Sequence, residues 1–251
     1  MLFPTGAFAL FFLGVFLAHW GLRRHLVADR CLLLGASILF YAQWSLEFCA
    51  LLGVLGLWAW GAGRLLAPRG DGIAAPRPAW LLPLAVAGPL AVLGWFKYAD
   101  FFLAEAGALL ARLGLEAPPL LGIVLPVGIS FFCFQAISYI VDVARGEARA
   151  EPSPLNVLVY IFFFPHLAAG PIVRAAHFLP QVATPADPRR IPFLMAGLLI
   201  LGGLVKKVLL ANTLATQLVD PVFRDPEGVA ALDALLAIYG YAAQIWCDFS
   251  A

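Results

Sequence analysis

Charged residues are scarce in this sequence: Asp, Glu, Lys and Arg together make up 12% of its 251 residues. Hydrophobic residues make up 63%, and the mean hydropathy is +0.91. These values exclude an ordinary soluble domain, in which about a quarter of the residues are charged. The net charge of +1 gives no indication of a nucleic-acid partner. The composition therefore predicts an all-α protein that crosses a lipid bilayer several times.

Paired cysteines and the common cofactor motifs are also missing. The sequence has no P-loop, dinucleotide fingerprint or metal-ligand cluster, so neither a bound metal nor a bound cofactor is predicted. The cysteines lie in apolar segments, and we expect them to be small buried hydrophobic residues. Their spacing fits neither a disulfide framework nor a metal site: they are Cys31, Cys49, Cys133 and Cys247.

Hydrophobic runs, by contrast, follow one another along the whole chain. A full bilayer crossing needs about 20 apolar residues, so the short run Cys31–Trp44 predicts a locally thinned membrane. Lys97–Glu116 has the amphipathic pattern of a helix that lies at the membrane surface. The predicted spans are Leu2–Trp20, Cys31–Trp44, Phe48–Leu66, Trp80–Phe96, Leu120–Val143, Ile191–Val205 and Val229–Ala251.

The two ends of the sequence carry further expectations. The run Leu2–Trp20 lacks the basic region and the cleavage site of a signal peptide, so we expect it to be kept as the first span. Arg23 and Arg24 predict a cytoplasmic loop after it and an external N-terminus. The last run is still apolar at Ala251. We therefore expect a single transmembrane domain over residues 1–251 that is truncated at its C-terminus.

One apolar stretch, residues 162–174, cannot form a simple helix. Pro165 and Pro171 each remove a backbone N–H, Gly170 adds conformational freedom, and Arg174 brings a charge. Inside a bilayer, such a backbone is tolerated only where protein buries it or where it lines a cavity. The stretch is thus predicted to form the wall of an intramembrane site. The charge pattern leaves open whether it crosses the membrane or re-enters it.

Polar side chains inside the predicted spans are the candidates for chemistry, because their desolvation is costly. For Gln135, we consider an interhelical hydrogen bond a better interpretation than contact with a substrate. Asp142 and Arg145 are three residues apart and predict an ion pair at a helix end. For His166, we expect a packing role rather than a catalytic one, because no carboxylate or nucleophile motif accompanies it in the sequence. Asp248 lies within the last apolar run and is the most costly charge, so it is a functional candidate.

The basic residues leave more than one interpretation. Arg174 is equally suited to holding a carboxylate or phosphate and to satisfying the carbonyl groups freed at Pro165 and Pro171. Lys206 and Lys207 end the predicted span before them. Extension toward lipid headgroups is favoured for these lysines over contact with an acidic donor molecule.

Five motifs occur in order along the chain: Phe96-Lys97-Tyr98 with Phe101-Phe102, residues 125–142 (LPVGISFFCFQAISYIVD), Phe164-Pro165 with residues 169–174 (AGPIVR), residues 203–207 (GLVKK), and Gln244-Ile245 with Asp248-Phe249-Ser250. This set resembles the membrane-bound O-acyltransferase family. The resemblance is to the branch of bacterial alginate O-acetyltransferases and the related D-alanyl transfer proteins of teichoic acid. It covers nearly the whole chain, and the order of the motifs makes it specific at the family level.

The resemblance implies a ring of tilted helices around a thin central funnel, in the bacterial inner membrane. It implies transfer of an acyl group from a cytoplasmic donor, acetyl-CoA, toward a hydroxyl of an extracytoplasmic polysaccharide such as alginate. Periplasmic partner proteins would complete the transfer to the exopolysaccharide. Lys206 and Lys207 are then candidates for contact with the donor. The candidates for the cavity or substrate path are Gln135, Pro165, Gly170, Pro171, Arg174 and Asp248.

The chain departs from the family pattern at histidine. The catalytic histidine of the family lies in a Trp-His-Ile-like segment after the Asp-Phe-Ser motif, and is thus expected beyond Ala251. His166 stands where relatives often carry Gln. No catalytic residue is therefore expected within residues 1–251, and this portion is expected to be inactive alone.

Two other classes of function are kept as alternatives. A secondary transporter would also use broken helices near the membrane midplane, but it should show a matching interrupted segment in its second half. A membrane scaffold would bind a periplasmic protein without consuming acetyl-CoA.

Overall fold

The computed structural model describes residues 5–67, 78–167, 172–185, 187–225 and 227–250. All regular elements in these ranges are helical, and they include no strand, as the composition predicts. The chain divides into two units, which are described separately. The larger unit is Leu13–Ala186, and the smaller unit combines Met1–Phe12 with Asp187–Ala251. The ring around a central funnel stays a prediction.

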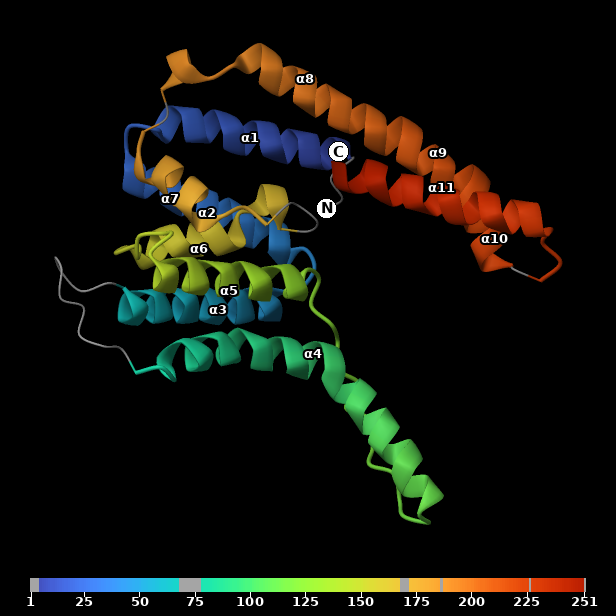
Figure 1. Ribbon diagram of the computed structural model, residues 1–251. Coiled ribbons are helices and arrows are strands. Elements are labelled where there is room, and N and C mark those ends of the chain that lie inside the picture. The colour runs from blue at the N-terminus through green and yellow to red at the C-terminus, as the bar shows by residue number, and fades with distance from the viewer. Residues whose placement is uncertain (1–4, 68–77, 168–171, 186, 226, 251) are drawn as a thin grey trace. The chain divides into compact units, whose positions relative to one another are not determined.

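The larger unit is a set of packed helices (Figure 1). Helix α5 packs against α3 and α4, and α6 packs against α2 and α3. Its core is apolar and centres on buried residues such as Ala59, Tyr139, Ile140 and Tyr160. The elements are α1 (Gly6–Leu22, which begins in the smaller unit), α2 (Leu26–Ala42), α3 (Leu46–Leu66), α4 (Leu81–Arg112), α5 (Ile129–Arg145), α6 (Pro154–Phe162), η1 (Phe164–His166) and α7 (Ala175–Ala183).

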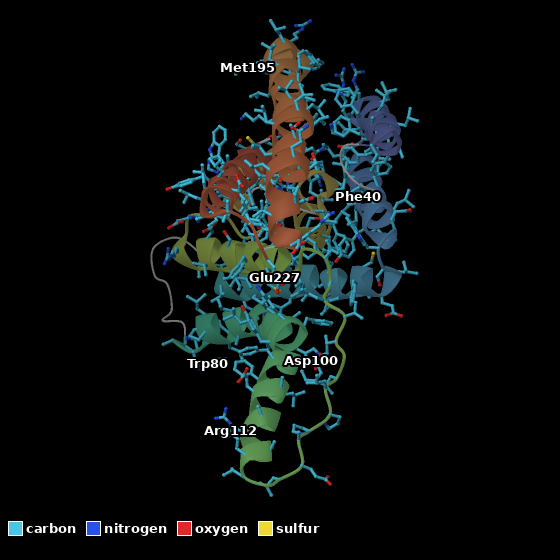
Figure 2. The ribbon with its side chains drawn as sticks, turned by 90° about the vertical axis from the view of Figure 1, so that its right-hand side faces the viewer. Phe40, Trp80, Asp100, Arg112, Met195 and Glu227 are labelled. Atoms are coloured by element: carbon cyan, nitrogen blue, oxygen red, sulfur yellow. The ribbon has the colours of Figure 1, made fainter. Side chains whose placement is uncertain are left out.

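Helix α4 combines two elements that the sequence predicts separately. It runs without interruption through 32 residues, so the predicted surface helix Lys97–Glu116 is wrong as a separate element. The helix bends, and its second half points away from α3 and α5 (Figure 1). The chain then returns along this half, where the Asp100 carboxylate accepts hydrogen bonds from the backbone N–H groups of Leu121 (2.7 Å) and Ile123 (2.9 Å). Figure 2 shows Asp100 and Arg112 on this second half.

The predicted span Leu120–Val143 is wrong in its first part, because α5 begins only at Ile129. Pro126 and Gly128 precede it, and Gly128 has a φ of +76° that an L side chain rarely adopts. A Cβ atom added at Gly128 would lie 2.9 Å from the carbonyl oxygen of Leu167, so only glycine allows this approach. Helix α5 ends in a left-handed Gly146, whose neighbour Glu147 donates its N–H to the carbonyl of Asp142 (2.8 Å).

The smaller unit contains a 32-residue helix, Phe193–Arg224, which includes two π-helical segments. The predicted span Ile191–Val205 is therefore too short, because the helix continues through Lys206 and Lys207. Helix α11 (Ala231–Ser250) packs along the π-helical segments. The parts of the long helix are α8 (Phe193–Leu204), η3 (Val205–Ala211), α9 (Asn212–Leu214), η4 (Ala215–Val219) and α10 (Asp220–Arg224), and the short turn η2 (Pro188–Arg190) precedes them.

Three helices in the described residues are long and apolar enough to cross a membrane: α3, α4 and Phe193–Arg224. The other predicted spans are helical but do not meet this standard. Helices α1, α2 and α5 have 17 residues each, fewer than the roughly 20 that a crossing needs. Helix α11 has 20 residues and carries two carboxylates, Asp233 and Asp248.

Candidate functional site

Gln135 joins two helices of the larger unit. Its side-chain amide donates a hydrogen bond of 2.8 Å to the carbonyl of Tyr160, which confirms the predicted interhelical bond. This carbonyl lies in the last turn of α6, where the helix breaks. The N–H of Phe164 would continue the helix, but it donates instead to the hydroxyl of Ser37 (3.2 Å), and Pro165 has no N–H to donate. Gln135 therefore satisfies a carbonyl group that the break leaves open.

Arg174 holds a carboxylate of the protein itself. Its Nη1 lies 2.5 Å from Oδ1 of Asp142 and 3.7 Å from Oε2 of Glu147. The predicted pair of Asp142 with Arg145 is thus wrong, because a residue 32 positions away supplies the charge instead. The Asp142 side chain is 3% exposed, whereas Arg174 is 59% exposed. This ion pair links α5 to the start of α7.

Tyr160 connects the Gln135 bond to the Arg174 ion pair. Its carbonyl accepts from Gln135, and its hydroxyl donates to the carbonyl of Val173 (2.7 Å), next to Arg174. We call these residues, Gln135, Asp142, Tyr160 and Arg174, the α5–α7 network. The structure thereby brings together two of the predicted cavity residues, Gln135 and Arg174. Pro165 lies in η1, while Gly170 and Pro171 fall outside the described residues.

His166 is packed between aromatic rings. Its ring centre lies 5.0 Å from that of Phe163 and 5.8 Å from that of Phe178. Its Nε2 atom is buried and has no hydrogen-bond partner in the structure. No ion pair with a carboxylate is present at His166 in the described part of the chain. The surroundings are those of a packing residue.

Lys207 and Asp248 form the second cluster, in the smaller unit. The Lys207 Nζ lies 2.7 Å from Oδ1 of Asp248, which links η3 to α11. Lys206 donates to the carbonyl of Ser250 (3.1 Å) and lies over the ring of Trp246. The predicted position of these lysines at the end of a span is wrong, because they lie within a continuous helix and contact α11. Their contact with lipid headgroups stays a prediction. π-Helical turns occur often at functional sites.

His19 and Asp29 make a contact that the sequence analysis missed. Nδ1 of His19 lies 2.6 Å from Oδ1 of Asp29, and the Asp29 side chain is 10% exposed. A tight turn between α1 and α2, closed by the N–H of His25 on the carbonyl of Leu22, brings them together. The ten-residue spacing across a helical hairpin is the only signal that could have shown it. A carboxylate that orients an imidazole is a feature of general bases, and it is also a way to fix such a turn.

The remaining site predictions concern cysteine and metal. All four cysteines are free thiols. Cys49, Cys133 and Cys247 are buried as expected, but Cys31 is exposed, so the prediction is wrong for this residue. Within the described ranges, no group of three His, Cys, Asp or Glu side chains could hold a metal ion.

Comparison with known proteins shows that the whole chain is similar to a part of several bacterial O-acetylases. The chain is 36% identical over 250 residues to the probable alginate O-acetylase AlgI of Pseudomonas putida, covering 100% of the chain and 50% of that protein. The corresponding protein of Pseudomonas aeruginosa is 34% identical, with 47% of it covered. A peptidoglycan O-acetyltransferase of Helicobacter pylori is 29% identical over 283 residues, with 52% covered. The chain thus spans about half the length of the curated relatives it matches. No family model matches it.

Proposed function

Because the chain is homologous over its whole length to alginate and peptidoglycan O-acetyltransferases of the membrane-bound O-acyltransferase type, we propose that it forms the N-terminal half of such an enzyme. The reaction is transfer of an acetyl group to a hydroxyl of a polysaccharide, with an alginate-like polymer as acceptor. The observation that carries this proposal is the 36% identity over the complete chain. The polar contacts inside long apolar helices agree with it.

The acetyl donor is acetyl-CoA, which reaches the protein from the cytoplasm. Of the two candidate lysines, Lys206 is the donor contact in this proposal, and Lys207 supports it. Lys207 is held by Asp248, so its role is to fix η3 against α11. Lys206 donates one hydrogen bond to a carbonyl and keeps two N–H groups that suit a phosphate of the donor. The enzyme works in the bacterial inner membrane, and periplasmic partner proteins complete transfer to the exopolysaccharide.

None of the four histidines of this chain performs the acyl transfer in this proposal. His166 is enclosed by Phe163 and Phe178, and His19 is bound by Asp29 in the α1–α2 turn. His25 and His177 are exposed and form no ion pair in the part of the chain that the structure describes. The catalytic histidine belongs to a region outside residues 1–251.

The test is complementation of a strain whose exopolysaccharide lacks O-acetyl groups. The full-length gene should restore acetyl esters, measured by NMR of the purified polymer, and membranes should consume radiolabelled acetyl-CoA. Replacing His25 or His177 by Ala, or His166 by Gln, should leave acetylation within about twofold of wild type, because none of these residues contacts the reacting atoms. Failure to restore acetyl esters would contradict the reaction, and uptake of a solute without them would favour a transporter. Recruitment of periplasmic proteins without consumption of acetyl-CoA would favour a scaffold.

A further inference from the structure

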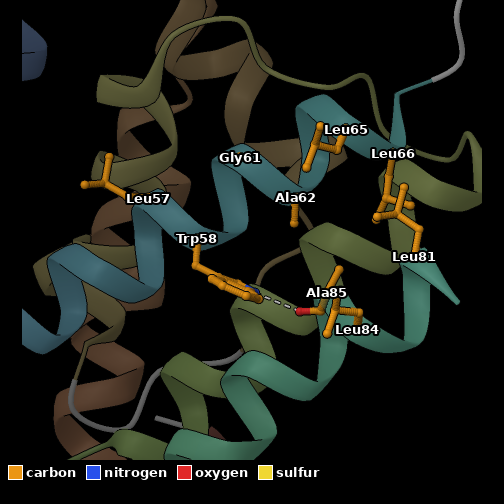
Figure 3. A pocket seen from close by; sticks show the side chains of 9 residues that line it. All are labelled: Leu57, Trp58, Gly61, Ala62, Leu65, Leu66, Leu81, Leu84 and Ala85. Carbon is orange, nitrogen blue, oxygen red and sulfur yellow. Dashed lines mark hydrogen bonds between the residues drawn. The ribbon is translucent and has the colours of Figure 1, made fainter.

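An apolar groove lies between α3 and α4, on the surface of the larger unit (Figure 3). Its volume is about 280 Å³, near the lower end of the range for ligand pockets. The lining runs from Leu57 to Leu66 on α3 and from Leu81 to Ala85 on α4, and every lining residue is apolar. Both helices are long and apolar enough to cross a membrane. The open side of the groove therefore faces lipid in a bilayer.

One wall of the groove is rigid. The indole N–H of Trp58 reaches from α3 to α4 and donates to the carbonyl of Ala85 (2.8 Å), as Figure 3 shows. The ring rests on Gly88, where an added Cβ atom would lie 2.5 Å from the Trp58 Cε2 atom. The hydrogen bond and this close packing hold the ring in place. The groove is thus a built feature of the two helices rather than a chance gap between mobile side chains.

The length of the groove matches one leaflet of a bilayer. Leu57 to Leu66 covers nine residue steps, or about 14 Å at the helical rise. This is close to half of the hydrocarbon core, which is about 30 Å thick. Trp80 lies at one end of the groove and is exposed, as is common for Trp at a membrane surface. The same end carries Arg64, in the last turn of α3.

Arg64 provides the charge for a headgroup. It follows Leu57 by seven residues, or about two turns, so it lies beside Leu57 at the edge of the groove, although it is not one of the lining residues. Its side chain is exposed, and no carboxylate pairs with it among the residues that the structure describes. Arginine binds phosphate well because its N–H groups match the phosphate oxygens. Basic residues that follow in the sequence, Arg69 and Arg77, predict the cytoplasmic leaflet, which is rich in anionic lipids.

We propose that the groove binds one acyl chain of an anionic phospholipid, with the lipid phosphate at Arg64. An empty apolar groove loses dispersion contacts along its whole length, and water does not fill a cavity without polar partners. A lipid chain restores these contacts, and Trp58 fixes its depth. The site goes beyond acetyl transfer and does not depend on it. It makes a specific lipid a structural partner of α3 and α4.

The test uses the full-length protein in nanodiscs that contain phosphatidylglycerol with a photoreactive diazirine in the middle of one acyl chain. Crosslinked peptides are mapped and counted by mass spectrometry. Gly61→Phe fills the groove, and Gly53→Phe is the matched control. Both glycines are on α3, and an added Cβ atom at either meets nothing within 4 Å, so neither substitution starts from a clash.

We expect crosslinks on the groove residues of wild type and of Gly53→Phe, and a roughly tenfold loss in Gly61→Phe. Crosslinking should decrease when unlabelled phosphatidylglycerol competes, and Arg64→Gln should remove the preference over phosphatidylcholine. Crosslinks spread evenly over the lipid-facing surface, or unchanged by Gly61→Phe, would overturn the proposal. Crosslinks between two protein copies through the groove would overturn it too, because a helix would then be the occupant. The acetylation assay is separate, so a negative result here leaves the proposed reaction standing.

Discussion

Two ion pairs between helices, Arg174–Asp142 and Lys207–Asp248, have the same chemistry and very different surroundings. In the larger unit, Arg174 binds an Asp142 carboxylate that is 3% exposed and lies within a packed core. In the smaller unit, Lys207 binds Asp248, and these side chains are 39% and 30% exposed. In the most apolar 18-residue window of the long helix, 0% of the residues are buried. The first pair therefore contributes to a core of large side chains, and the second joins helices whose buried residues are few and mostly small: Ala211, Val219, Ala237, Gly240 and Cys247.

This difference shows that a charged residue in an apolar segment does not by itself indicate how much its ion pair contributes to stability. A buried carboxylate must be neutralised, because leaving it unpaired is far more costly than the gain from pairing it. A half-exposed ion pair can be replaced with little loss of stability. Its main contribution is then to fix the positions of the two helices that it joins. The following predictions test the comparison, from the largest expected effect to the smallest.

Arg174→Met should cause the largest loss of stability. It leaves the buried Asp142 carboxylate without its cation, and the free energy of unfolding should fall by about 3 kcal/mol. Asp142→Asn should cost less, about 1 kcal/mol, because the remaining guanidinium is 59% exposed. The measurement is denaturant unfolding in detergent micelles, followed by tryptophan fluorescence. Equal losses in the two variants would contradict the asymmetry.

Gly63→Ala in the larger unit and Gly240→Ala in the smaller unit compare the packing directly. A Cβ atom at Gly63 would lie 2.8 Å from Cε1 of Tyr139, a fully buried ring whose hydroxyl accepts from the N–H of Glu151. This variant should lose about 2 kcal/mol of stability through overpacking.

At Gly240 the contact is with the end of the Leu218 side chain, 2.5 Å away, which can rotate. The better helix propensity of Ala, worth about 1 kcal/mol, should then offset most of the cost. Thermal unfolding of both variants measures the two losses of stability. A larger loss at Gly240 than at Gly63 would show that the smaller unit is the more rigid of the two.

Lys207→Met should change stability only slightly. Polar contacts in membrane proteins contribute on average about 0.6 kcal/mol, and Asp248 is not deeply buried. A double-mutant cycle with Asp248→Leu should give a coupling energy of this size. Acetyl transfer should fall more than stability does, because the pair fixes η3 beside the proposed donor contact Lys206. A coupling of about 3 kcal/mol would instead make this pair equivalent to that of the larger unit.

His166→Gln should have almost no effect. Its Nε2 atom has no hydrogen-bond partner to lose, and Gln fills a similar volume between Phe163 and Phe178. We expect stability within about 0.5 kcal/mol of wild type and unchanged acetylation in the full-length protein. A loss of acetylation as severe as that from replacing the catalytic histidine would make His166 a reacting group.

Local patterns predicted the fold where one physical effect dominated. The span Phe48–Leu66 differs from α3 by two residues, because a long apolar run sits between a polar turn and basic residues. The start of α5 was missed, since hydropathy treats Leu120 and Ile129 alike, while Pro126 and the left-handed Gly128 prevent a helix between them. Apolar composition decides that a segment enters lipid, and backbone chemistry decides where its helix begins.

The candidate sites were predictable as residues but not as partners. Gln135 was correctly expected to bond another helix, because a buried amide must be satisfied. Asp142 was paired with Arg145 from helical spacing, yet its partner is Arg174. Lys207 was predicted to be a charge at the end of a span, although Asp248, 41 residues later, holds it. The three- and four-residue spacing of a helix identifies neighbours only within that helix, and these partners lie on different helices.

The π-helical segments η3 and η4 have a consequence for how this sequence can vary in length. Each residue of an α-helix turns the chain by about 100°, so removing one residue from η3 would rotate everything after it by about that angle. The contact of Leu218 with Gly240 would then be lost, while the ion pair of Lys207 with Asp248 would remain within reach. Selection at this point should therefore act on the number of residues as strongly as on their identity. Insertions and deletions between Val205 and Val219 should be rarer among functional homologues than substitutions there.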